Sequence, residues 1–407
     1  MNLVRRLLLI AAVLLLAAPA RAADADFQKW LEAVWPAARE QGVSRATFDA
    51  ATRGLEPDLS LPDLVIPGRV DRQPAQAEFV QTPAEYLKEN AFDRLAGDGR
   101  KLAEQHRATL AKVEQRFGVP GPIILAIWAR ETNYGAAKLP YNAIRALATQ
   151  AYLGRRKEQF REEFLLALKM LQEGQATLDN MRSSWGGALG QPQLIPSSFY
   201  KYAVDFDGDG RKDIWTSVPD VLGTIANHLT ELGWQRGQRW AYEVRAPQGA
   251  DCAIAQPDVK MKIGEWVRRG YTPSANRKLS AAELEVEASL LMPAGLYGPA
   301  FLTPANYFVL KEYNFSDLYV LFVGHLADRI AGARAFETPW QKIDQLKTAS
   351  LEQMQRELTR RGLYKEKVDG KAGMLTRAAL GAYQKQNGLT VDCWPTQAVL
   401  DHMKHGR

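Results

Sequence analysis

Cysteine and histidine are scarce in this chain, which limits the chemistry that it can support. Only Cys252 and Cys393 occur among 407 residues, and the five histidines are scattered without a helical metal-ligand pair in the body of the chain. A zinc site is therefore not predicted. Two cysteines can pair in an oxidising compartment. These two lie in segments that we expect to belong to different domains, so a bridge is possible but is not the default expectation.

Long hydrophobic runs are missing except at the N-terminus. Arg5 and Arg6 precede an apolar run over residues 7–16, and Ala20-Arg21-Ala22 fits the small-x-small rule for signal cleavage. We therefore predict a signal peptide over residues 1–22 and a soluble, exported protein with no transmembrane segment after its removal. The alternative is an uncleaved N-terminal anchor, for which the run is short.

A strong excess of one charge sign is also missing. The net charge of +6 includes Arg5, Arg6 and Arg21 of the predicted signal, which contains no acid, so +3 remains for the rest. An excess this small does not indicate a nucleic-acid partner. It is compatible with an anionic polymer but does not point to one.

What the chain does have is helical periodicity over most of its length. Residues 233–312 lose this periodicity and predict a smaller, strand-containing subdomain. A Pro-rich run over residues 57–74 is expected to wrap the body of the protein. The predicted fold class is mainly α (α+β), with a body over residues 23–340, a linker near 339–350 and a compact helical module over 349–407. Helices are expected over residues 27–41, 102–117, 123–131, 160–173 and 314–334.

The helix expected over residues 160–173 carries two acids that we do not assign to catalysis. Its apolar side chains recur at helical spacing and define a buried stripe. Glu162 and Glu163 lie off that stripe, so both are interpreted as part of a solvated face.

Glu131 is different, because it lies on the apolar stripe of its predicted helix. The segment 123–135 reads IILAIWARETNYG, and positions 123, 124, 127 and 128 share one face with Glu131. A carboxyl group that loses hydration favours its neutral form, which a general acid for glycosidic bond cleavage requires. Gly135 is expected to end the helix and leave Glu131 at the rim of a cleft. The alternative is a structural ion pair with Arg130, and this segment alone favours that alternative.

A second segment, residues 183–199, has the composition expected of a sugar-binding loop. Its sequence, SSWGGALGQPQLIPSSF, contains three glycines, which allow close backbone approach. A sugar presents hydroxyls on its edges and C–H groups on its faces. A tight turn leading into a helix capped by Ser197 or Ser198 is the plainer interpretation, and the two are compatible. The loop supplies neutral hydrogen-bonding and flat apolar side chains: Ser184, Trp185, Gln191, Gln193 and Phe199.

These segments carry a resemblance to a known family. "WARETNYG" at 128–135, "SWGGALGQPQLIPSS" at 184–198 and "YNFSDLYV" at 313–320 resemble, in order and spacing, the motifs of the lytic murein transglycosylase B family. The resemblance covers about residues 25–335 and implies a lysozyme-like fold. His228 is a departure, since relatives often have an aromatic ring there. The resemblance implies Glu131 as the single catalytic acid and these sugar-contacting residues: Ser184, Gln193, Tyr313, Asn314 and Tyr319.

The chemistry implied by the resemblance needs one acid. Ordinary glycosidases use two carboxylates, and the motifs offer no second acid with an independent claim. In the implied reaction Glu131 cleaves the β-1,4 bond between N-acetylmuramic acid and N-acetylglucosamine and forms a 1,6-anhydro product without a cofactor. The partner is then the peptidoglycan glycan strand, in the periplasm. The alternatives are a muramidase that uses water and a non-catalytic, calcium-stabilised wall-binding protein.

An acidic loop over residues 205–220 predicts a structural calcium site. Its first nine residues, DFDGDGRKD at 205–213, have carboxylates at loop positions 1, 3, 5 and 9 and Gly at position 6, as in the first part of a calcium loop. Thr216 stands at position 12, where an acid is usual. The family's calcium loop has a late last acid, for which Asp220 is the match. The candidate ligands are Asp205, Asp207, Asp209, the Arg211 carbonyl, Asp213 and Asp220, and the alternative is an exposed acidic turn.

The C-terminal residues resemble a second family. The order "VDGKAG" and "TRAALGAYQ" over residues 368–384 resembles the type-one peptidoglycan-binding module, a three-helix domain. Met374 replaces a common Pro, and Cys393 stands where Gly is usual. A module tethered in this way raises the local concentration of substrate without taking part in the chemistry.

Overall fold

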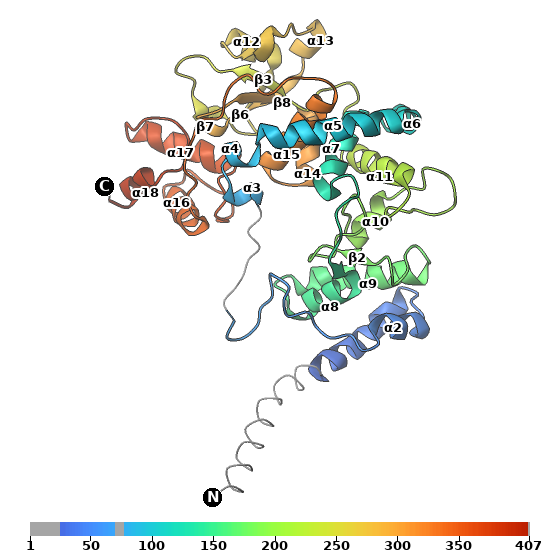
Figure 1. Cartoon of the computed structure of the whole chain (residues 1–407). Helices are drawn as coiled ribbons and strands as arrows, with labels where there is room; N and C mark the ends of the chain where they lie inside the picture. Colours follow the sequence, from blue (N-terminus) through green and yellow to red (C-terminus); the bar gives the residue numbers. More distant parts are fainter. Residues whose placement is uncertain (1–24, 70–76, 406–407) are drawn as a thin grey trace, which may run out of the picture. The chain divides into compact units, whose positions relative to one another are not determined.

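The computed structural model describes residues 25–69 and 77–405. The predicted signal over residues 1–22 lies outside the described residues. The chain forms two compact units (Figure 1), which we describe separately. The first contains the described residues up to 69 and residues 131–224. The second contains residues 77–130 and 225–405.

The first unit is a helical body that has a small apolar cluster at Leu61, Leu64 and Ala146 and one main core. The helix over residues 25–40 confirms the expectation for 27–41, and its Phe27 packs with Phe48 and Phe164 in that core. The described helix α9 confirms the expectation for 160–173. The short strands β1 and β2 pair antiparallel, and both contact α8. The elements are α2 Arg45–Thr52, β1 Tyr141–Asn142, α8 Ala143–Leu153, α9 Lys157–Gln172, β2 Arg182–Ser183, α10 Pro196–Tyr202 and the first half of α11 Val218–Glu231.

The Pro-rich run wraps this body as predicted, over its described part. Arg145 Nε on α8 donates to Glu56 O at 2.8 Å, and Gln150 Nε2 donates to Pro62 O at 2.9 Å. Val65 N donates to Leu153 O at 2.7 Å. Since proline leaves fewer backbone donors in the run, side chains of α8 supply several of its hydrogen bonds.

The interpretation of Glu163 as solvated is wrong. Glu163 is 5 % exposed, and its carboxylate accepts hydrogen bonds from Ser197 N at 2.9 Å and from Ser197 Oγ at 2.6 Å. Helix α10 begins at Pro196, so Ser197 lies in its first turn and is not the cap. An acid from another helix therefore satisfies the free N–H groups at this helix end. Glu162 is exposed, as expected.

The single helix expected over residues 102–117 is also wrong. In the second unit α5 Glu89–Gln105 and α6 Arg107–Phe117 are separated at His106, whose φ of −107° and ψ of 21° are not helical. The His106 ring packs edge-on to Trp128, with ring centroids 6.4 Å apart. A tertiary contact of this kind is invisible to periodicity along the chain, which continues through the break.

The strand-containing subdomain is confirmed, since an antiparallel five-stranded sheet lies within residues 233–312. Its order is β4-β6-β8-β3-β5, and Leu290 of β6 faces Leu302 of β8 in the core. The unit's strands are β3 Tyr242–Arg245, β4 Lys260–Lys262, β5 Thr272–Pro273, β6 Glu287–Leu291, β7 Pro293–Leu296 and β8 Ala300–Thr303. Its other helices include α3 Ala77–Val80, α4 Pro83–Tyr86, α7 Gly121–Thr132, α12 Ile263–Arg268, α13 Ala281–Leu284, α14 Ala305–Tyr313 and α15 Asp317–Ile330.

The C-terminal helical module is confirmed as three helices with a core of their own: α16 Thr348–Arg360, α17 Met374–Gln386 and α18 Gln397–His405. The segment before it is not a loose tether. Gln341 N donates to Tyr297 O at 2.8 Å, and the module's Trp394 Nε1 donates to Asp344 O at 3.0 Å. The module is therefore part of the second unit.

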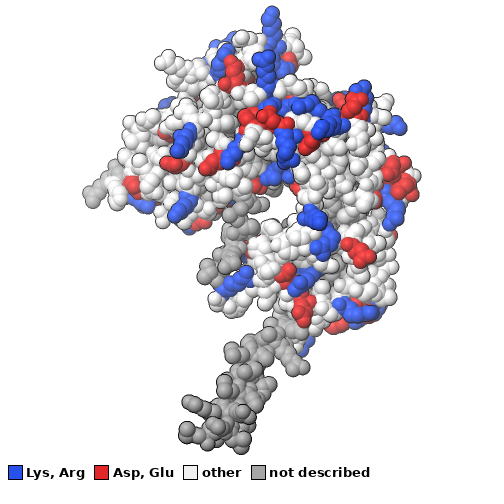
Figure 2. Space-filling view, in the orientation of Figure 1, with Lys and Arg blue, Asp and Glu red and all other residues white. Residues whose placement is uncertain are grey.

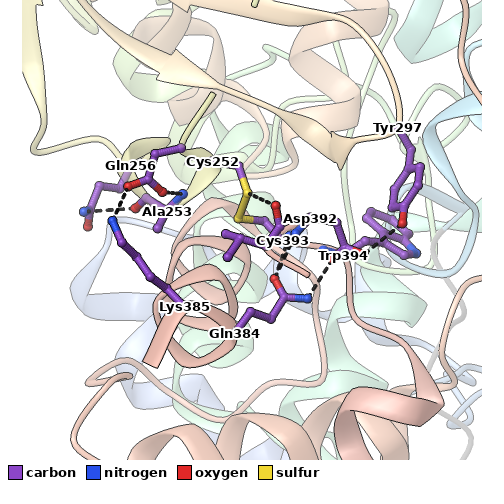
Figure 3. The surroundings of a disulfide bond; sticks show 11 residues. Cys252, Ala253, Gln256, Tyr297, Gln384, Lys385, Asp392, Cys393 and Trp394 are labelled. Carbon is purple, nitrogen blue, oxygen red and sulfur yellow. Dashed lines mark hydrogen bonds and ion pairs between the residues drawn. A yellow bond between two sulfur atoms is a disulfide. The ribbon is translucent and has the colours of Figure 1, made fainter. Parts of the chain in front are cut away.

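A disulfide joins the module to the sheet subdomain, so the default expectation of unpaired cysteines is wrong. Cys252 and Cys393 have Cα atoms 6.1 Å apart and are separated by 141 residues (Figure 3). Cys393 has φ +57°, the left-handed region that glycine prefers, in keeping with the Gly usual there. Around the bond, Gln384 accepts from Cys393 N at 2.9 Å, and Tyr297 donates to Asp392 at 2.8 Å. The fold brings the two cysteines together although they are far apart in the sequence.

Removing this bond is expected to destabilise the second unit. A Cys252→Ala, Cys393→Ala double variant is expected to lose about 2–5 kcal/mol of unfolding free energy, because the unfolded chain gains the freedom of a long loop. Thermal unfolding of the two proteins, each with and without a thiol reductant, measures this. The reductant is expected to lower the midpoint of the parent only. An equal midpoint for parent and variant would contradict the prediction.

The surface carries both charge signs. Lys and Arg are interspersed with Asp and Glu over the face shown in Figure 2, which agrees with the small net charge. Among residues 25–69 and 77–405, no helix combines the length and apolarity that crossing a membrane requires.

Candidate active site

Glu131 is the next-to-last residue of α7. The helix starts at Gly121, between Pro120 and Pro122, as their φ preference predicts. Residues 123–129 are all buried, so the helix is apolar on every side rather than along one stripe. It ends at Thr132, before Gly135, because Asn133 and Tyr134 adopt left-handed φ values of 49° and 58°. Glu131 is half-buried at that end.

The C-terminal end of α7 contacts the second motif, residues 184–198, within the first unit. Thr132 Oγ1 donates to Gln191 O at 2.9 Å and accepts from Gly135 N at 3.2 Å. Gly135 has φ +82°, and a Cβ there would lie 2.3 Å from Gln191 Oε1. Gln191 in turn donates from Nε2 to Trp215 O at 2.7 Å, beside the acidic loop. The backbone that carries Glu131 is thus fixed by the loop predicted to bind sugar.

Ser184 and Gln193 belong to that loop and shape it. Ser184 Oγ accepts from Ala188 N at 3.2 Å. Gln193 has φ +57°, and its Nε2 donates to Gly190 O at 2.9 Å. A Cβ at Gly190 would lie 2.6 Å from Ile214, so the close backbone approach expected of the glycines is present. Both side chains are half-buried and retain exposed surface for a ligand.

Arg130 directly precedes Glu131, and the sequence suggested it only as an ion-pair partner of that acid. In the second unit its Nε donates to Tyr86 Oη at 3.0 Å, and its Nη2 lies 3.8 Å from Glu78. The guanidinium also lies 5.9 Å from the Tyr319 ring centroid and 5.5 Å from that of Phe322. Such an aromatic setting favours a fixed cation. Its position between Ala129 and Glu131 in the first motif is the feature of the sequence that could have drawn attention to Arg130.

The third motif lies in the second unit, across the end of α14 and the start of α15. Tyr313 and Asn314 are half-buried, and Asn314 Oδ1 accepts from Ser316 N at 3.1 Å. Tyr319 is only 1 % exposed, beneath Arg130. His228 packs against Tyr313 in a tilted arrangement, with ring centroids 4.5 Å apart, so the residue that departs from the family contacts an expected sugar-binding residue.

The acidic loop brings three of its expected ligands together. Asp205, Asp207 and Asp209 each offer a carboxylate oxygen, and these oxygens lie within 4.8 Å of one another. Asp205 accepts from Gly208 N at 2.7 Å and Gly210 N at 2.8 Å, which folds the loop back over its own first residue. Oxygen donors at this spacing fit a hard cation such as Ca²⁺.

Asp213 and Asp220 are outside that cluster. Asp220 is fully buried and accepts from the backbone of Phe206, Asp207 and Asp213. Burial is the main cause that raises the pKa of Asp220, with these hydrogen bonds opposing it. Burial would also raise the pKa of Asp213, but hydrogen bonds from Thr216 and Trp215 outweigh it and lower that pKa. Both acids therefore stabilise the loop by accepting hydrogen bonds from its own backbone.

Comparison with known proteins places the chain in a family. The transglycosylase SLT domain family matches residues 26–328, most of the chain. The chain belongs to this family of lytic transglycosylases. A peptidoglycan binding domain family matches residues 347–403. The membrane-bound lytic murein transglycosylase B of Escherichia coli (strain K12) is 32 % identical over 235 residues, which span 56 % of this chain and 62 % of that relative.

Solved structures agree with this SLT transglycosylase assignment. SltB3 from Pseudomonas aeruginosa in complex with NAG-anhNAM-pentapeptide has a TM-score of 0.84 and 38 % identity, covering 93 % of this chain and 99 % of that one. The Escherichia coli lytic transglycosylase Slt35 in complex with calcium has a TM-score of 0.51 and 28 % identity, covering 61 % and 77 %. The predicted lysozyme-like, mainly helical fold is confirmed.

Proposed function

We propose that this transglycosylase cleaves murein glycan strands between N-acetylmuramic acid and N-acetylglucosamine, with Glu131 as its single acid and base. The observation that carries the proposal is the setting of Glu131, half-buried at the end of an apolar helix and seated on the Gln191 loop. Burial favours the protonated form that an acid catalyst needs. Ser184, Gln193, Tyr313 and Asn314 are the proposed sugar contacts, and Tyr319, which is 1 % exposed against Arg130, is proposed to support the site rather than to touch the sugar.

The reaction runs in two proton transfers. Glu131 gives its proton to the bridging oxygen, and the bond from that oxygen to C1 of the muramic acid breaks. The N-acetyl oxygen of the same sugar supports the positive charge that develops at C1. Glu131, now ionised, takes the proton of the C6 hydroxyl, whose oxygen bonds to C1 and closes a 1,6-anhydro ring. General acid–base help of this kind contributes on the order of 10²–10⁴ in rate.

The rest of the chain is assigned to delivery and binding. Residues 1–22 direct export, so the enzyme acts in the periplasm, and residues 23–340 form the catalytic domain. Residues 349–407 bind murein, and Arg377 Nη2 on α17 lies 2.9 Å from Asp317 of the catalytic domain, with both side chains 7 % exposed. The fixed contact supports a module that holds the strand in one direction rather than a freely tethered one.

The masses of the reaction fragments test the proposed reaction. Purified sacculi digested with the enzyme are expected to yield fragments that end in anhydromuramic acid, each one water lighter than the hydrolysis product. Fragments of full hydrolytic mass would assign the chain to the muramidases, and no fragments at all would favour a non-catalytic wall-binding protein.

The acidic loop is proposed to bind a structural Ca²⁺ ion. Asp205, Asp207 and Asp209 are the carboxylate ligands, and the Arg211 carbonyl occupies the seventh loop position. Asp213 and Asp220 are the remaining candidates of the set. Trp215 lies within the loop, and its carbonyl accepts a hydrogen bond from Gln191 Nε2. The ion therefore stabilises the backbone that carries Glu131 without entering the chemistry.

Calcium removal is expected to lower thermal stability and activity together. At a hundredfold excess of free Ca²⁺ over its dissociation constant, one site adds about 2.7 kcal/mol of stability. Thermal unfolding with chelator and with added Ca²⁺ measures this shift, and Asp209→Asn is expected to reduce it. Arg39→Gln, far along the chain, is a control in which the shift is retained. An unchanged midpoint after chelation would refute the calcium site.

A further inference from the structure

A small cavity lies within the second unit, apart from the third motif. Its volume is about 260 Å³, below the about 300–1,000 Å³ of most ligand pockets, so it admits one small ring. Its walls come from the first turn of α7, the last turn of α15 and the turn that follows α11. Arg130 approaches Tyr319 at the opposite ends of α7 and α15. The cavity is therefore separate from the proposed sugar contacts.

The walls of this cavity are apolar, and their charges compensate each other. Pro120, Pro122 and Trp234 supply flat apolar surface. Of the described residues that line the cavity, only Arg239 and Asp328 are charged. Arg239 Nη2 lies 3.1 Å from both carboxylate oxygens of Asp328. Because this pair leaves no net charge in the wall, the cavity favours a neutral ligand over a charged one.

Two polar atoms of the cavity's side chains have no partner. The indole Nε1 of Trp234 and the amide Oε1 of Gln238 are buried, and neither makes a hydrogen bond within residues 25–69 and 77–405. Trp234 as a whole is only 8 % exposed. The indole nitrogen can only donate, and the amide oxygen can only accept. Since buried polar atoms are nearly always paired, the two atoms indicate a ligand that offers one acceptor and one donor.

Asn306 fixes the turn that carries both side chains. Its Nδ2 donates to Gln235 O and to Gln238 O, both at 2.9 Å, and its Oδ1 accepts from Gln235 N at 2.7 Å. The turn starts with a hydrogen bond from Trp234 N to Leu229 O at 3.0 Å. A turn held in this way is preorganised, so a ligand has little protein to order when it binds.

We propose that this cavity binds an N-acetylhexosamine ring, as a second sugar site that takes no part in the cleavage. The N-acetyl group carries a carbonyl acceptor beside an N–H donor, which match Trp234 Nε1 and Gln238 Oε1. The C–H face of the sugar packs on the indole and the prolines, and the ring is neutral, as the walls require. Such rings occur in murein strands and in the saccharides released from them. The binding does not depend on how the enzyme breaks the strand.

The signals of the tryptophan indoles test this site in the full chain. The protein is isotope-labelled on its indole nitrogens, and a Trp234→Phe variant identifies the Trp234 signal in the NMR spectrum. N-acetylglucosamine at millimolar concentrations is expected to shift this signal, because the indole N–H gains a carbonyl partner. Trp266 is the internal control. Its Nε1 already donates to Ala288 O at 2.8 Å, so its signal is expected to stay in place.

Two further ligands define what the cavity recognises. Glucose has the ring without the N-acetyl group, and we expect it to bind at least about tenfold more weakly, because the amide hydrogen bonds are lost. Peptide-free glycan strands are added to the Glu131→Gln chain, in which we expect them to stay uncut. A shift with strands and monosaccharide identifies the strand as the source of the ring. A shift with the monosaccharide alone identifies the released saccharides.

Three variants make the result specific to the cavity. Gln238→Met keeps the length of the side chain without its acceptor and is expected to weaken binding about tenfold. Ala331 lines the cavity and is exposed, so Ala331→Phe is expected to block the site and abolish the Trp234 shift. Ala335→Phe is the matched control, because Ala335 is exposed but does not line the cavity.

A Trp234 signal that N-acetylglucosamine leaves in place would overturn the site, because water alone would then occupy the cavity. A shift that persists in Ala331→Phe, or that glucose reproduces at the same concentration, would overturn it as well. These results are independent of the cleavage reaction. A parent enzyme that binds the sugar at Trp234 but releases no anhydromuramic fragments would contradict the proposed function alone.

Discussion

A Glu131→Gln variant is expected to fold normally and to lose murein cleavage by at least about 10²–10⁴-fold. The amide keeps the size of the side chain but can neither give the proton to the bridging oxygen nor take one from the C6 hydroxyl. Residues 123–129 of the helix are buried and mainly apolar, so we expect the helix to keep its packing when this carboxyl becomes an amide of the same size. Release of soluble fragments from purified sacculi measures the activity, and thermal unfolding verifies the fold.

Glu162→Gln is the matched control for this substitution. Glu162 is an exposed acid on α9, so the same change of charge there is expected to leave the cleavage rate unaltered. A folded Glu131→Gln protein that still releases fragments at the parent rate would remove Glu131 from the mechanism. A variant that fails to fold would show that the carboxyl has a structural partner, as the ion-pair alternative states.

Local sequence pattern predicted the parts of the fold that depend on near neighbours in the chain. The prolines at 120 and 122 marked the start of α7, and the loss of helical periodicity after residue 233 marked the sheet. The three motifs also identified the family before any geometry was known. Each of these signals is read within a short window, where propensity and periodicity are informative.

The parts that sequence missed depend on contacts between distant segments. Glu163 was interpreted as solvated, but Ser197 approaches it from another helix. Cys252 and Cys393 were placed in different domains, but the fold brings their Cα atoms to 6.1 Å. The Arg377–Asp317 pair joins residues 60 positions apart. None of these pairings leaves a local trace, because an ion pair or a disulfide imposes no spacing on the residues between its ends.

The missed contacts concern the residues that hold the backbone around the proposed site. Sequence motifs named Glu131 and Gln193, but the role of Gln191 as a seat required the distances to Thr132 and Trp215. The same division applies to the module. Its family was visible in its sequence, whereas its buried contact with the catalytic domain, from Arg377 to Asp317, was not.

Replacing Asp317 by asparagine is expected to destabilise the protein by about 3–5 kcal/mol at neutral pH, because Lys311 and Arg377 lose the carboxylate that compensates them in a buried site. Burial alone would raise the pKa of Asp317, but these two cations outweigh it and hold the pKa well below its usual range. A depressed folded pKa means that the stabilisation is present above the unfolded value, near about 3.9, and is lost as the pH falls through the folded value.

The midpoint of thermal unfolding, followed from pH 7 down to pH 3, is therefore expected to separate the parent from Asp317→Asn most at neutral pH and least in acid. Asp93→Asn is the matched control, because Asp93 pairs with Arg329 but its side chain is 68 % exposed, and such pairs contribute at most about 1 kcal/mol. If Asp317→Asn were no more destabilising than this control, or if its deficit grew toward low pH, Asp317 would not be the ionised link between the module and α15. Confirmation would instead identify one buried carboxylate as the group that fixes the wall-binding module beside the Tyr313–Asn314 loop.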